Sequence, residues 1–549
     1  MKKRYVLCLL VLASLVCTGC SKGGSGVSQS STTEKQPIEM TKETEESTKP
    51  VAMPAGPVTE ISVGIPGEYG DLSPFGGNSQ GRNYVKYNLW ETLAVFNQFG
   101  ETYDNMDWVL AKEIKPVDDV TTDIEIYDSI YDTNGNHLTA DDVVWSYEQA
   151  VSCGLFPKVK SNLKSMKKTG DYTVEMVLNG TGLGDLEYML SYVAIASKSS
   201  YEASSDKMSN HPVATGPYKV VESVPGSRLV LEKNGDYWQK DTTKLAYTAK
   251  QPLQKITFNV IKETAQMAIA LETGAIDIAS SISSSEIGRF MQSNGTGKDG
   301  YLVNSTYGGM AVVLDFNCDA VSPLSNPKLR QAISYAIDRK GIVDGALQGY
   351  GKTIGTPGSR VCSDYDISWD DIDYPYDPVK AKQLVKESGY KGETLRIMTE
   401  QTAEQPIVAQ MIQAYLSDVG INAKVLTYDN ALFSQYRYQP DQFDMMIGIM
   451  GTSAYVVGAW DLQFNSKGSK NGAAACFAKD DKLQNLLEVA KGKNTHTRET
   501  VNAFASYQRE MDYGLGLYCK ASYCVANSKV SEIVCHPFGH LIAGACSYR

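Results

Sequence analysis

The sequence predicts mixed α/β lobes, and three observations support this fold class. Helical and strand patterns interleave along most of the chain, which is typical of α/β architectures. The folded part runs from about residue 58 to 549 and is too long for one ordinary core, given roughly 100–200 residues per domain. No internal repeat is visible, so nothing indicates a repeat architecture. We therefore expect two or three α/β lobes.

The first elements of the folded part carry strand and capping signals. Residues 61–65 (ISVGI) alternate in polarity and run into a Gly/Pro loop, which predicts a strand. Residues 123–137 predict a hairpin with its turn at Asn134-Gly135. Thr139, with Asp142 three residues later, has the pattern of a capping box and predicts a helix. A strand is therefore followed closely by a helix.

Four later helices are predicted by apolar spacing, by capping residues and by glycine stops. They are expected to begin at Thr264, Ser325, Asp377 and Pro406, and the first, third and fourth end at Gly274, Gly389 and Gly420. Strands are expected to follow two of them, at 275–279 and 421–425. This succession extends the mixed α/β pattern through the second half of the chain.

The N-terminus has the pattern of a lipoprotein signal peptide over residues 1–19. Basic residues at 2–4 precede an apolar stretch at 5–16, and the small pair Thr18-Gly19 precedes Cys20. Cys17 departs from the pattern, since Leu, Val or Ile is usual there. We expect lipid on Cys20, followed by a disordered tether over 20–57 with few large apolar residues. A transmembrane anchor is the alternative, but the stretch is shorter than the ~20 apolar residues that span a bilayer.

Charge and hydropathy indicate where the mature chain resides and which partners it avoids. The net charge is −11, and loss of Lys2, Lys3 and Arg4 with the signal would make it −14. Such a surface repels phosphate backbones, so we expect no nucleic-acid partner. Because no second stretch approaches a membrane span, we expect the protein to be extracytoplasmic. Lipid would hold it on the outer face of the bacterial cytoplasmic membrane, in the periplasm where an outer membrane exists.

Eight cysteines follow Cys20, and an even number in an exported chain permits disulfides. We predict at least one disulfide, with Cys519 and Cys524 as participants in the cysteine-rich tail. Zinc is the alternative for this tail, but its spacings lack the short C-x2–4-C pairs of structural zinc sites. We therefore expect no metal site and no cofactor.

Five motifs, in order along the chain, carry a family resemblance. They are HLTADDVVWS at 137–146, ATGPYK at 214–219, NGDYW at 234–238, PKLRQAISYAIDRK at 327–340 and YDPVKA at 376–381. Through them the chain resembles the peptide/nickel class of extracellular solute-binding proteins of ABC transporters, family 5. The resemblance covers about residues 72–530. Because these motifs shape the scaffold, they say little about the ligand.

The resemblance implies a two-lobed periplasmic-binding-protein-like fold with a hinge between the lobes. Lobe I would comprise 58–303 and 515–549, with an inserted subdomain at about 85–210, and lobe II would comprise 304–514. The chain crosses between the lobes near 302–308 and 512–520. The implied function is capture of a solute between the lobes and its delivery to ABC permease subunits. We expect a monomer.

Comparison with dipeptide-binding members of the family bears on the ligand. Those proteins hold the ligand carboxylate with an Arg and a Tyr, at positions that fall here on Thr399 and Gln401. They also place an Asp near the ligand ammonium. In this chain the ammonium would have no counter-charge unless Asp461 moves into that position. Both departures argue against a free dipeptide and favour an oligopeptide. An oligosaccharide, a cationic small molecule and a sensor that presents its ligand remain alternatives.

Seven positions correspond to those with which members of the family grip their ligands. They are Tyr69, Tyr307, Glu400, Gln401, Tyr455, Trp460 and Asp461. Aromatic and acidic residues predominate among them, which favours a neutral or cationic ligand. The resemblance thus predicts the site residues.

Catalysis is the alternative from another class, and the sequence offers little for it. Residues 346–353 fit a permissive P-loop pattern, but a predicted helix precedes them where a strand is required. No G-x-S-x-G or H-E-x-x-H motif occurs, and the five histidines lack catalytic spacing. A hydrolase with paired carboxylates is the remaining enzymatic alternative. We therefore expect a binding protein with no catalytic residue.

Overall fold

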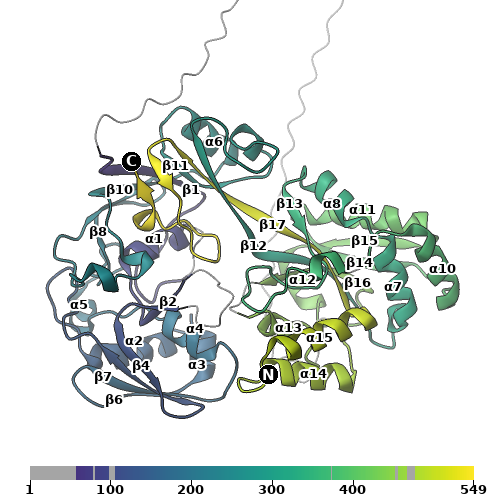
Figure 1. Ribbon diagram of the computed structural model, residues 1–549, viewed down its shortest axis with the longest axis horizontal. Coiled ribbons are helices and arrows are strands. Elements are labelled where there is room, and N and C mark those ends of the chain that lie inside the picture. Colours follow the sequence, from purple (N-terminus) through teal and green to yellow (C-terminus); the bar gives the residue numbers. More distant parts are fainter. Residues whose placement is uncertain are drawn as a thin grey trace, which may run out of the picture. The chain divides into compact units, whose positions relative to one another are not determined.

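A computed structural model describes residues 57–77, 79, 81–97, 106–372, 374–402, 404–451, 455–466 and 476–549 (Figure 1). Helices and strands interleave along this part, so the predicted α/β class is confirmed. The predicted signal peptide, Cys20 and all but the last residue of the tether lie outside the described residues. Among the described helices, none is both long and apolar enough to cross a membrane.

An eleven-stranded sheet links most of the described chain. Its order is β15-β14-β16-β12-β17-β11-β1-β10-β9-β8, with β13 (Gly351–Thr353) paired to β17. One end contains β1 (Glu60–Ile65), β8 (Tyr218–Val224), β9 (Arg228–Lys233), β10 (Lys255–Val260) and β11 (Ile278–Ile282). β1 lies parallel to β10 and β11, and β9 joins β8 and β10 in antiparallel pairs. β1 confirms the strand predicted at 61–65, whereas β11 begins three residues later than the strand predicted at 275–279.

Two long antiparallel strands, β12 (Tyr301–Phe316) and β17 (Gly514–Asn527), join the two ends of this sheet. Their pairing runs from Tyr301 opposite Asn527 to Asp315 opposite Gly514. The register shifts twice, once between Tyr307 and Ala311 and again at Val312. We call the part built on β1 and β8–β11, with the C-terminal tail, the first lobe. The second lobe is built on β13–β16 (Figure 1).

The first lobe also contains a four-stranded antiparallel sheet in the order β4-β5-β7-β6. Its elements are β4 (Ala111–Pro116), β5 (Thr121–Ile126), β6 (Leu163–Lys168), β7 (Thr173–Leu178), α2 (Ala140–Ser152) and α3 (Pro157–Asn162). The capping box at Thr139 and Asp142 starts α2 as predicted. The hairpin predicted at 123–137 is confirmed only around its turn at Asn134-Gly135, where Tyr131 and His137 form an isolated antiparallel bridge. The strand before the turn does not pair across it, because β5 pairs with β4 and β7. Residues 131–137 instead form a tight loop in which the Asp132 carboxylate accepts from the backbone N–H groups of Asn134 and Asn136.

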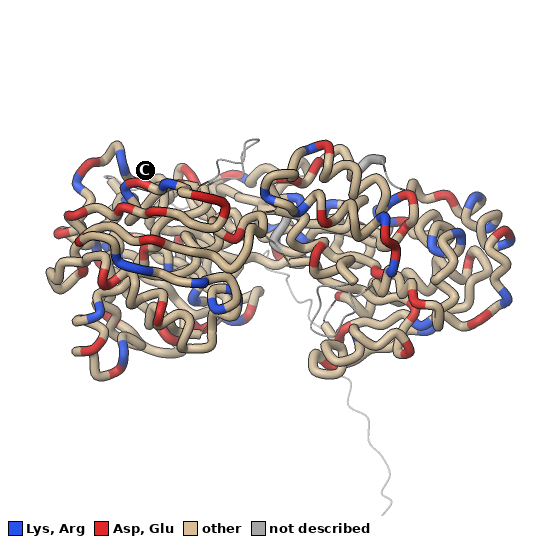
Figure 2. The backbone as a smooth tube through the Cα atoms, turned by 90° about the horizontal axis from the view of Figure 1, so that it is seen from below, with Lys and Arg blue, Asp and Glu red and all other residues tan. Residues whose placement is uncertain are grey.

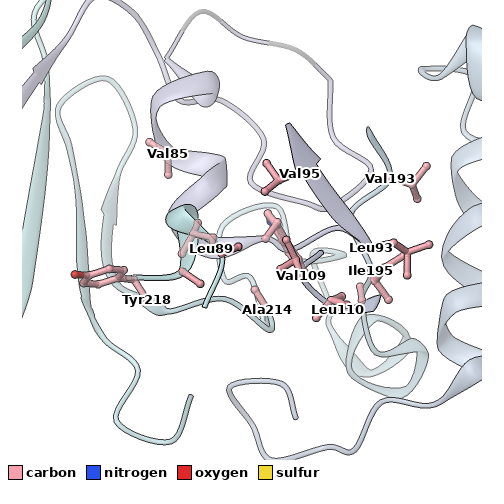
Figure 3. Packing of buried hydrophobic residues seen from close by; sticks show 14 of the residues in the cluster. Val85, Leu89, Leu93, Val95, Val109, Leu110, Val193, Ile195, Ala214 and Tyr218 are labelled. Carbon is pink, nitrogen blue, oxygen red and sulfur yellow. The ribbon is translucent and has the colours of Figure 1, made fainter. Parts of the chain in front are cut away.

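Apolar residues from distant segments pack together to form the first-lobe core. Figure 3 shows Val85 and Leu89 of α1 (Arg82–Leu89) in the same cluster as Val109, Ile195, Ala214 and Tyr218. The C-terminal tail closes on this lobe, since the Val58 N–H donates to the Arg549 carbonyl at 2.8 Å. The remaining elements are β2 (Ala94–Phe96), β3 (Met106–Trp108), α4 (Asp185–Tyr192), α5 (Lys198–Ala203), α6 (Thr264–Glu272), β18 (Val530–Glu532) and β19 (Ser547–Tyr548).

The second lobe packs helices on both sides of β14 (Leu395–Glu400), β15 (Ala423–Tyr428) and β16 (Met445–Gly451). One core includes α7 (Pro327–Ala336), α8 (Arg339–Ala346), α10 (Pro378–Ser388) and α11 (Gln405–Asp418). The other includes α9 (Trp369–Ile372), α13 (Val456–Phe464), α14 (Asp481–Lys491) and α15 (Arg498–Met511), while α12 (Asn430–Tyr436) packs near β14.

Capping in the second lobe agrees with the sequence at one helix and differs at another. Asp377 accepts from the N–H groups of Val379 and Lys380, and Gly389 ends α10 at φ 73°, as predicted. The cap of α7 is Asn326 and not Ser325, because the Asn326 carboxamide accepts the Lys328 N–H. A one-residue shift of this kind is expected where neighbouring residues are all able to cap.

The disulfide prediction is wrong for the described residues, since all eight cysteines from Cys153 to Cys546 are free thiols. Cys519 and Cys524 are five residues apart on β17, so their side chains point to opposite faces of the strand. Cys519 packs in a second-lobe core and Cys524 in the first-lobe core. Basic and acidic residues are interspersed along the chain without a single-sign band (Figure 2).

Candidate functional site

A cavity of about 1090 Å³ lies between the two lobes, and we call it the cleft. The first lobe contributes residues of α1, α3, α4 and the loop after β11, and the second contributes β16, α13 and the loop after α12. Met310 of β12 and Lys520 of β17 line it where these strands join the lobes. Small-molecule sites usually measure about 300–1,000 Å³, so the cleft is large enough for an extended ligand.

The second-lobe wall of the cleft exposes aliphatic side chains. Met310 is 47% exposed, Ile449 is 39% exposed and Leu462 is 78% exposed, and all three line the cleft. Next to them are Gly458 and Ala459 of α13, whose small size leaves space for a ligand beside the helix. Exposed apolar residues that gather in one place usually mark a binding surface. This wall is therefore suited to cover the apolar parts of a ligand.

The first-lobe wall is aromatic. Tyr188 and Tyr192 of α4 stack with their ring centroids 4.3 Å apart at an interplanar angle of 22°, and Tyr84 of α1 lies on the same side. Lys158 Nζ lies 4.6 Å from the Tyr188 ring centroid and 3.4 Å from Asp185 Oδ1. Such rings offer flat surfaces with polar hydroxyl ends, which suit peptide groups and aromatic ligands.

The charges that line the cleft are mainly positive. Lys158, Arg437 and Lys520 face one acid, Glu404, in the described lining. Lys520 Nζ pairs with Glu404 Oε2 at 2.8 Å, so these two charges cancel. Lys158 pairs with Asp185 at 3.4 Å, so Arg437 is the lining cation without an ion pair among the described residues. It favours an anionic ligand group, which differs from the expected preference for a neutral or cationic ligand.

Arg437 is the cation most available to a ligand. Its guanidinium carbon lies 5.2 Å from the Tyr438 ring centroid, and its buried Nε has no hydrogen-bond partner among the described residues. Arg437 also lies close enough to Asp315 on β12, a fully buried residue, for its charge to act on that carboxyl group. Burial raises the pKa of Asp315 to about 7, and Arg437 and Gln463 limit this increase.

The structure places the first four predicted ligand residues away from the cleft lining. Tyr69 is buried in the first lobe, where its hydroxyl lies 3.1 Å from Ser223 Oγ. Tyr307 lies on β12 with Lys352 Nζ 5.5 Å from its ring centroid. Glu400 Oε1 accepts from Asn430 Nδ2 at 2.7 Å, and Gln401 is exposed at the end of β14. Thr399, at the position of the dipeptide-binding Arg, is completely buried.

The other three predicted residues share one helix with residues that do line the cleft. Tyr455 caps α13, and its hydroxyl lies 3.4 Å from Glu187 Oε1 of α4 in the first lobe. Trp460 is fully buried and donates from Nε1 to the Pro357 carbonyl at 2.6 Å. Asp461 pairs with Lys491 at 2.7 Å. None of the seven is in the described cleft lining, and their roles stay predictions.

Arg437, Tyr438 and the stacked pair Tyr188 and Tyr192 line the cleft but are not among the seven residues predicted from the sequence. A signal was available in QYRYQP at 435–440, where an arginine stands between two tyrosines four residues before a mostly buried strand. An arginine beside aromatic rings can form cation–π contacts with them. The positions implied by the family resemblance lie on other segments, so they do not point to this run.

Two α/β lobes joined by a pair of strands, with a large cleft between them, define a two-lobed binding protein. The model of the bacterial extracellular solute-binding proteins, family 5 (Middle), matches residues 108–472, which is more than half of the chain. The chain belongs to this family. The family comprises substrate-binding transport proteins, and 108–472 includes parts of both lobes and strand β12.

Curated relatives share about a quarter of their residues with the chain. Heme-binding protein A of Haemophilus influenzae is 27% identical over 344 residues, which cover 58% of this chain and 59% of that protein. The dipeptide-binding protein of Escherichia coli is 24% identical over 430 residues, covering 74% and 75%. The match to the first of these thus spans less than two thirds of its length.

Solved structures share the fold. HbpA2 from Haemophilus parasuis superposes with a TM-score of 0.77 at 20% identity, over 89% of this chain and all of that chain. The oligopeptide-binding protein AppA from Bacillus subtilis, in complex with a nonapeptide, gives a TM-score of 0.65 at 20% identity over 90% and 100%. At this identity the likeness establishes the fold, and the cleft has to be interpreted from its own residues.

Proposed function

We propose that this protein binds an oligopeptide in the cleft between its lobes and delivers it to the permease of an ABC importer. The observation that carries the proposal is the set of exposed aliphatic side chains, Met310, Ile449 and Leu462, inside a cavity that both lobes line. Such a surface is unfavourable in water and becomes favourable when a ligand or the opposite lobe covers it.

The size and polarity of the cleft support a peptide. Serine hydroxyls at Ser281, Ser283 and Ser284 line it beside the tyrosines of α1 and α4, so peptide amides and apolar side chains both find partners. Among the relatives, the E. coli protein is named for dipeptides and the B. subtilis structure holds a nonapeptide. Because the cleft measures about 1090 Å³, an oligopeptide fits this chain better than a dipeptide.

Arg437 would hold an anionic group of that peptide, such as its C-terminal carboxylate. Its guanidinium can form two parallel hydrogen bonds with a carboxylate, and its Nε is already desolvated and unpartnered among described residues. The buried Asp315 beneath it retains a proton more readily than an exposed acid and so neutralises Arg437 less.

Ligand capture would require rotation of the lobes about β12 and β17. We assign lobe I to 58–303 and 515–549, with the subdomain at about 85–210, and lobe II to 304–514. Closure would move α4 towards α13, where Tyr455 and Glu187 already meet at 3.4 Å. Of the seven predicted residues, Tyr307 and Tyr455 are therefore the best placed to contact a ligand in the closed form.

The mature chain would be held outside the cell membrane by lipid on Cys20. Replacement of Cys20 by Ala is expected to release the protein into the medium or periplasm, because no described helix can hold it in a bilayer. Retention of the variant in membranes after a high-salt wash would contradict this proposal. We propose a monomer that binds without catalysis.

Native mass spectrometry of the purified mature protein, followed by calorimetry with pools of synthetic peptides, tests the function. We expect a retained or added peptide of three or more residues to bind to wild type, and Ile449→Ser with Leu462→Ser to weaken it. The exposed pair Val379→Ser and Ile367→Ser, on second-lobe surfaces outside the described cleft lining, provides the control. Absence of binding by every peptide pool would contradict the proposal.

Haem is a second candidate, since one relative is named for it. Haem carries carboxylates on a flat aromatic ring, and the cleft combines stacked tyrosines with the cation Arg437. Titration with haem, followed by absorbance, separates this candidate from a peptide. Import and ligand presentation to a sensor are distinguished by whether peptide uptake by cells requires the protein.

A further inference from the structure

A second cavity, of about 190 Å³, lies in the first lobe, and we call it the side pocket. Its walls come from α1, from the segment after α1, from the end of α4 and from the loop at 536–540. Asn83, Phe96, Tyr192, Phe538 and His540 line both the side pocket and the cleft. A ligand in the cleft can therefore extend a group into the side pocket.

The side pocket contains an ammonium group that has no counter-charge among the described residues. Lys86 of α1 places Nζ 4.8 Å from the ring centroid of Tyr87 and 6.0 Å from that of Tyr192. Among the described residues it has no hydrogen-bond or ion-pair partner. Burial, assisted by the charge of Arg82, lowers the pKa of Lys86 to about 8, so the group is still mainly charged at pH 7.

The other charged groups of the side pocket are already engaged. Arg82 directs its guanidinium to the backbone carbonyls of Asp71 and Ser73. Glu91 accepts from the Tyr237 hydroxyl at 2.5 Å and from Trp238 Nε1 at 2.9 Å, and burial raises its pKa to about 7. Glu91, the acid of the pocket, therefore faces the core and does little to neutralise the positive charge of Lys86.

The two histidines of the side pocket are neutral at pH 7. Burial and the charge of Lys86 lower the pKa of His540 to about 4 and hold the pKa of His536 well below its usual value. His536 stacks on Tyr87 with the centroids 4.7 Å apart, and His540 meets the Tyr84 ring edge-on at 5.4 Å. The pocket is thus an aromatic enclosure with one accessible positive charge.

We propose that the side pocket is a subsite for an anionic group carried on an aromatic or apolar stem. An acidic side chain of a peptide bound in the cleft is the ligand group that fits it. Aromatic faces stabilise a desolvated ammonium only in part, and a carboxylate that enters the pocket would supply the missing counter-charge. In its peptide form this inference rests on the proposed function, because the rest of the peptide would lie in the cleft.

A fragment tests the side pocket without requiring a peptide. Phenylacetate and its neutral analogue phenylacetamide are titrated into the mature protein and followed by ligand-observed NMR. We expect wild type to bind phenylacetate at least about tenfold more tightly than the amide, as for a charge-assisted hydrogen bond. Lys86→Met should lose this difference, whereas Lys86→Arg should keep it. Lys198→Met, which changes an exposed lysine 3.9 Å from Glu202, is the matched control.

Equal binding of the two fragments to wild type, or an unchanged preference in Lys86→Met, would overturn the proposal. Lys86→Arg keeps the test valid if the methionine variant fails to fold.

Peptide pairs that differ only by Glu and Gln at one position form the second part of the experiment. We expect the acidic peptide to bind better to wild type and the two to bind equally to Lys86→Met. If phenylacetate binds through Lys86 but no peptide binds at all, the proposed function fails and the subsite stands. If peptides bind with no acid preference at any position, the subsite is overturned and the proposed function stands.

Discussion

The two lobes present different chemistry to the same cleft. The first-lobe wall consists of tyrosines such as Tyr188 and Tyr192, whereas the second-lobe wall consists of exposed aliphatic residues such as Ile449 and Leu462. Aromatic rings hold a ligand in a preferred orientation, while aliphatic side chains cover it with little directional demand. The difference suggests that the first lobe selects the ligand and the second lobe encloses it.

The lobes also differ in the surroundings of an ionisable side chain that forms no ion pair with described residues. In the first lobe Lys86 faces a cavity and remains mainly protonated, with its pKa near 8. In the second lobe Asp315 is completely buried, and its pKa rises to about 7, so much of its charge is lost near neutral pH. A group with access to a ligand can keep its charge, whereas a sealed group gives it up by binding a proton.

The largest expected effect concerns the inner face of α13, which supports the second-lobe wall. Trp460→Ala removes a fully buried ring that packs 4.7 Å from Phe504, and should lower the free energy of unfolding by about 3–5 kcal/mol. Leu462→Ala on the same helix should change it by less than about 0.5 kcal/mol, because that side chain is 78% exposed. Urea denaturation measures both. Similar losses in the two variants would show that α13 does not divide into a core face and a ligand face.

A smaller effect is expected where the second lobe meets a charged ligand group. Arg437→Met should weaken binding of a peptide with a free C-terminal carboxylate by about 2 kcal/mol, as for a hydrogen bond to a charged group. Binding of the same peptide with an amidated C-terminus should change little. Lys479→Met, an exposed second-lobe lysine 3.2 Å from Asp319, provides the control in calorimetry. A loss of equal size for both peptides would show that Arg437 acts through packing and not through charge.

A third effect is expected in the pH dependence of stability due to Asp315. Its pKa is raised in the folded state, so its stabilising contribution is complete below its unfolded pKa near 4 and is lost as the pH rises through about 7. The stability of wild type relative to Asp315→Asn should therefore fall by about 1 kcal/mol or more between pH 4 and pH 8. Denaturation at several pH values measures this difference, and a constant difference would refute it. Other titrating groups cancel in the comparison where they do not contact this site.

Much of the fold could be predicted because its signals are local. The capping box at Thr139 and the Asp377 and Gly389 ends of α10 depend on residues within one or two turns, and the structure has all of them. The pairing of β5 could not be predicted, since its partner β7 begins 47 residues after the end of β5. A plausible turn at Asn134-Gly135 suggested a local partner, but tertiary packing provides a better one for the strand.

For the site, the sequence could predict one secondary-structure element that lines the cleft, but not which of its residues face the ligand. Placement by family led to α13 and its cap at Tyr455, and α13 does line the cleft. It selected Trp460 and Asp461, whereas Leu462 and Gln463, one and two positions further on, face the cavity. Each residue along a helix turns the side chain by about 100°, so the choice of face depends on what packs around the helix. The sequence holds that information only through contacts distant along the chain.

The two faces of α13 have a consequence for how this protein could change over evolutionary time. The inner face, with Trp460 and Phe464, is committed to the second-lobe core, while Gly458 and Leu462, four residues apart, border the space for the ligand. Gly458 is exposed, so a larger residue there would fill ligand space and leave the interior unchanged. A lineage could therefore adjust the length or bulk of its cargo by single substitutions on one helical stripe. Proteins descended from such a chain would therefore differ in ligand specificity before they differed in fold.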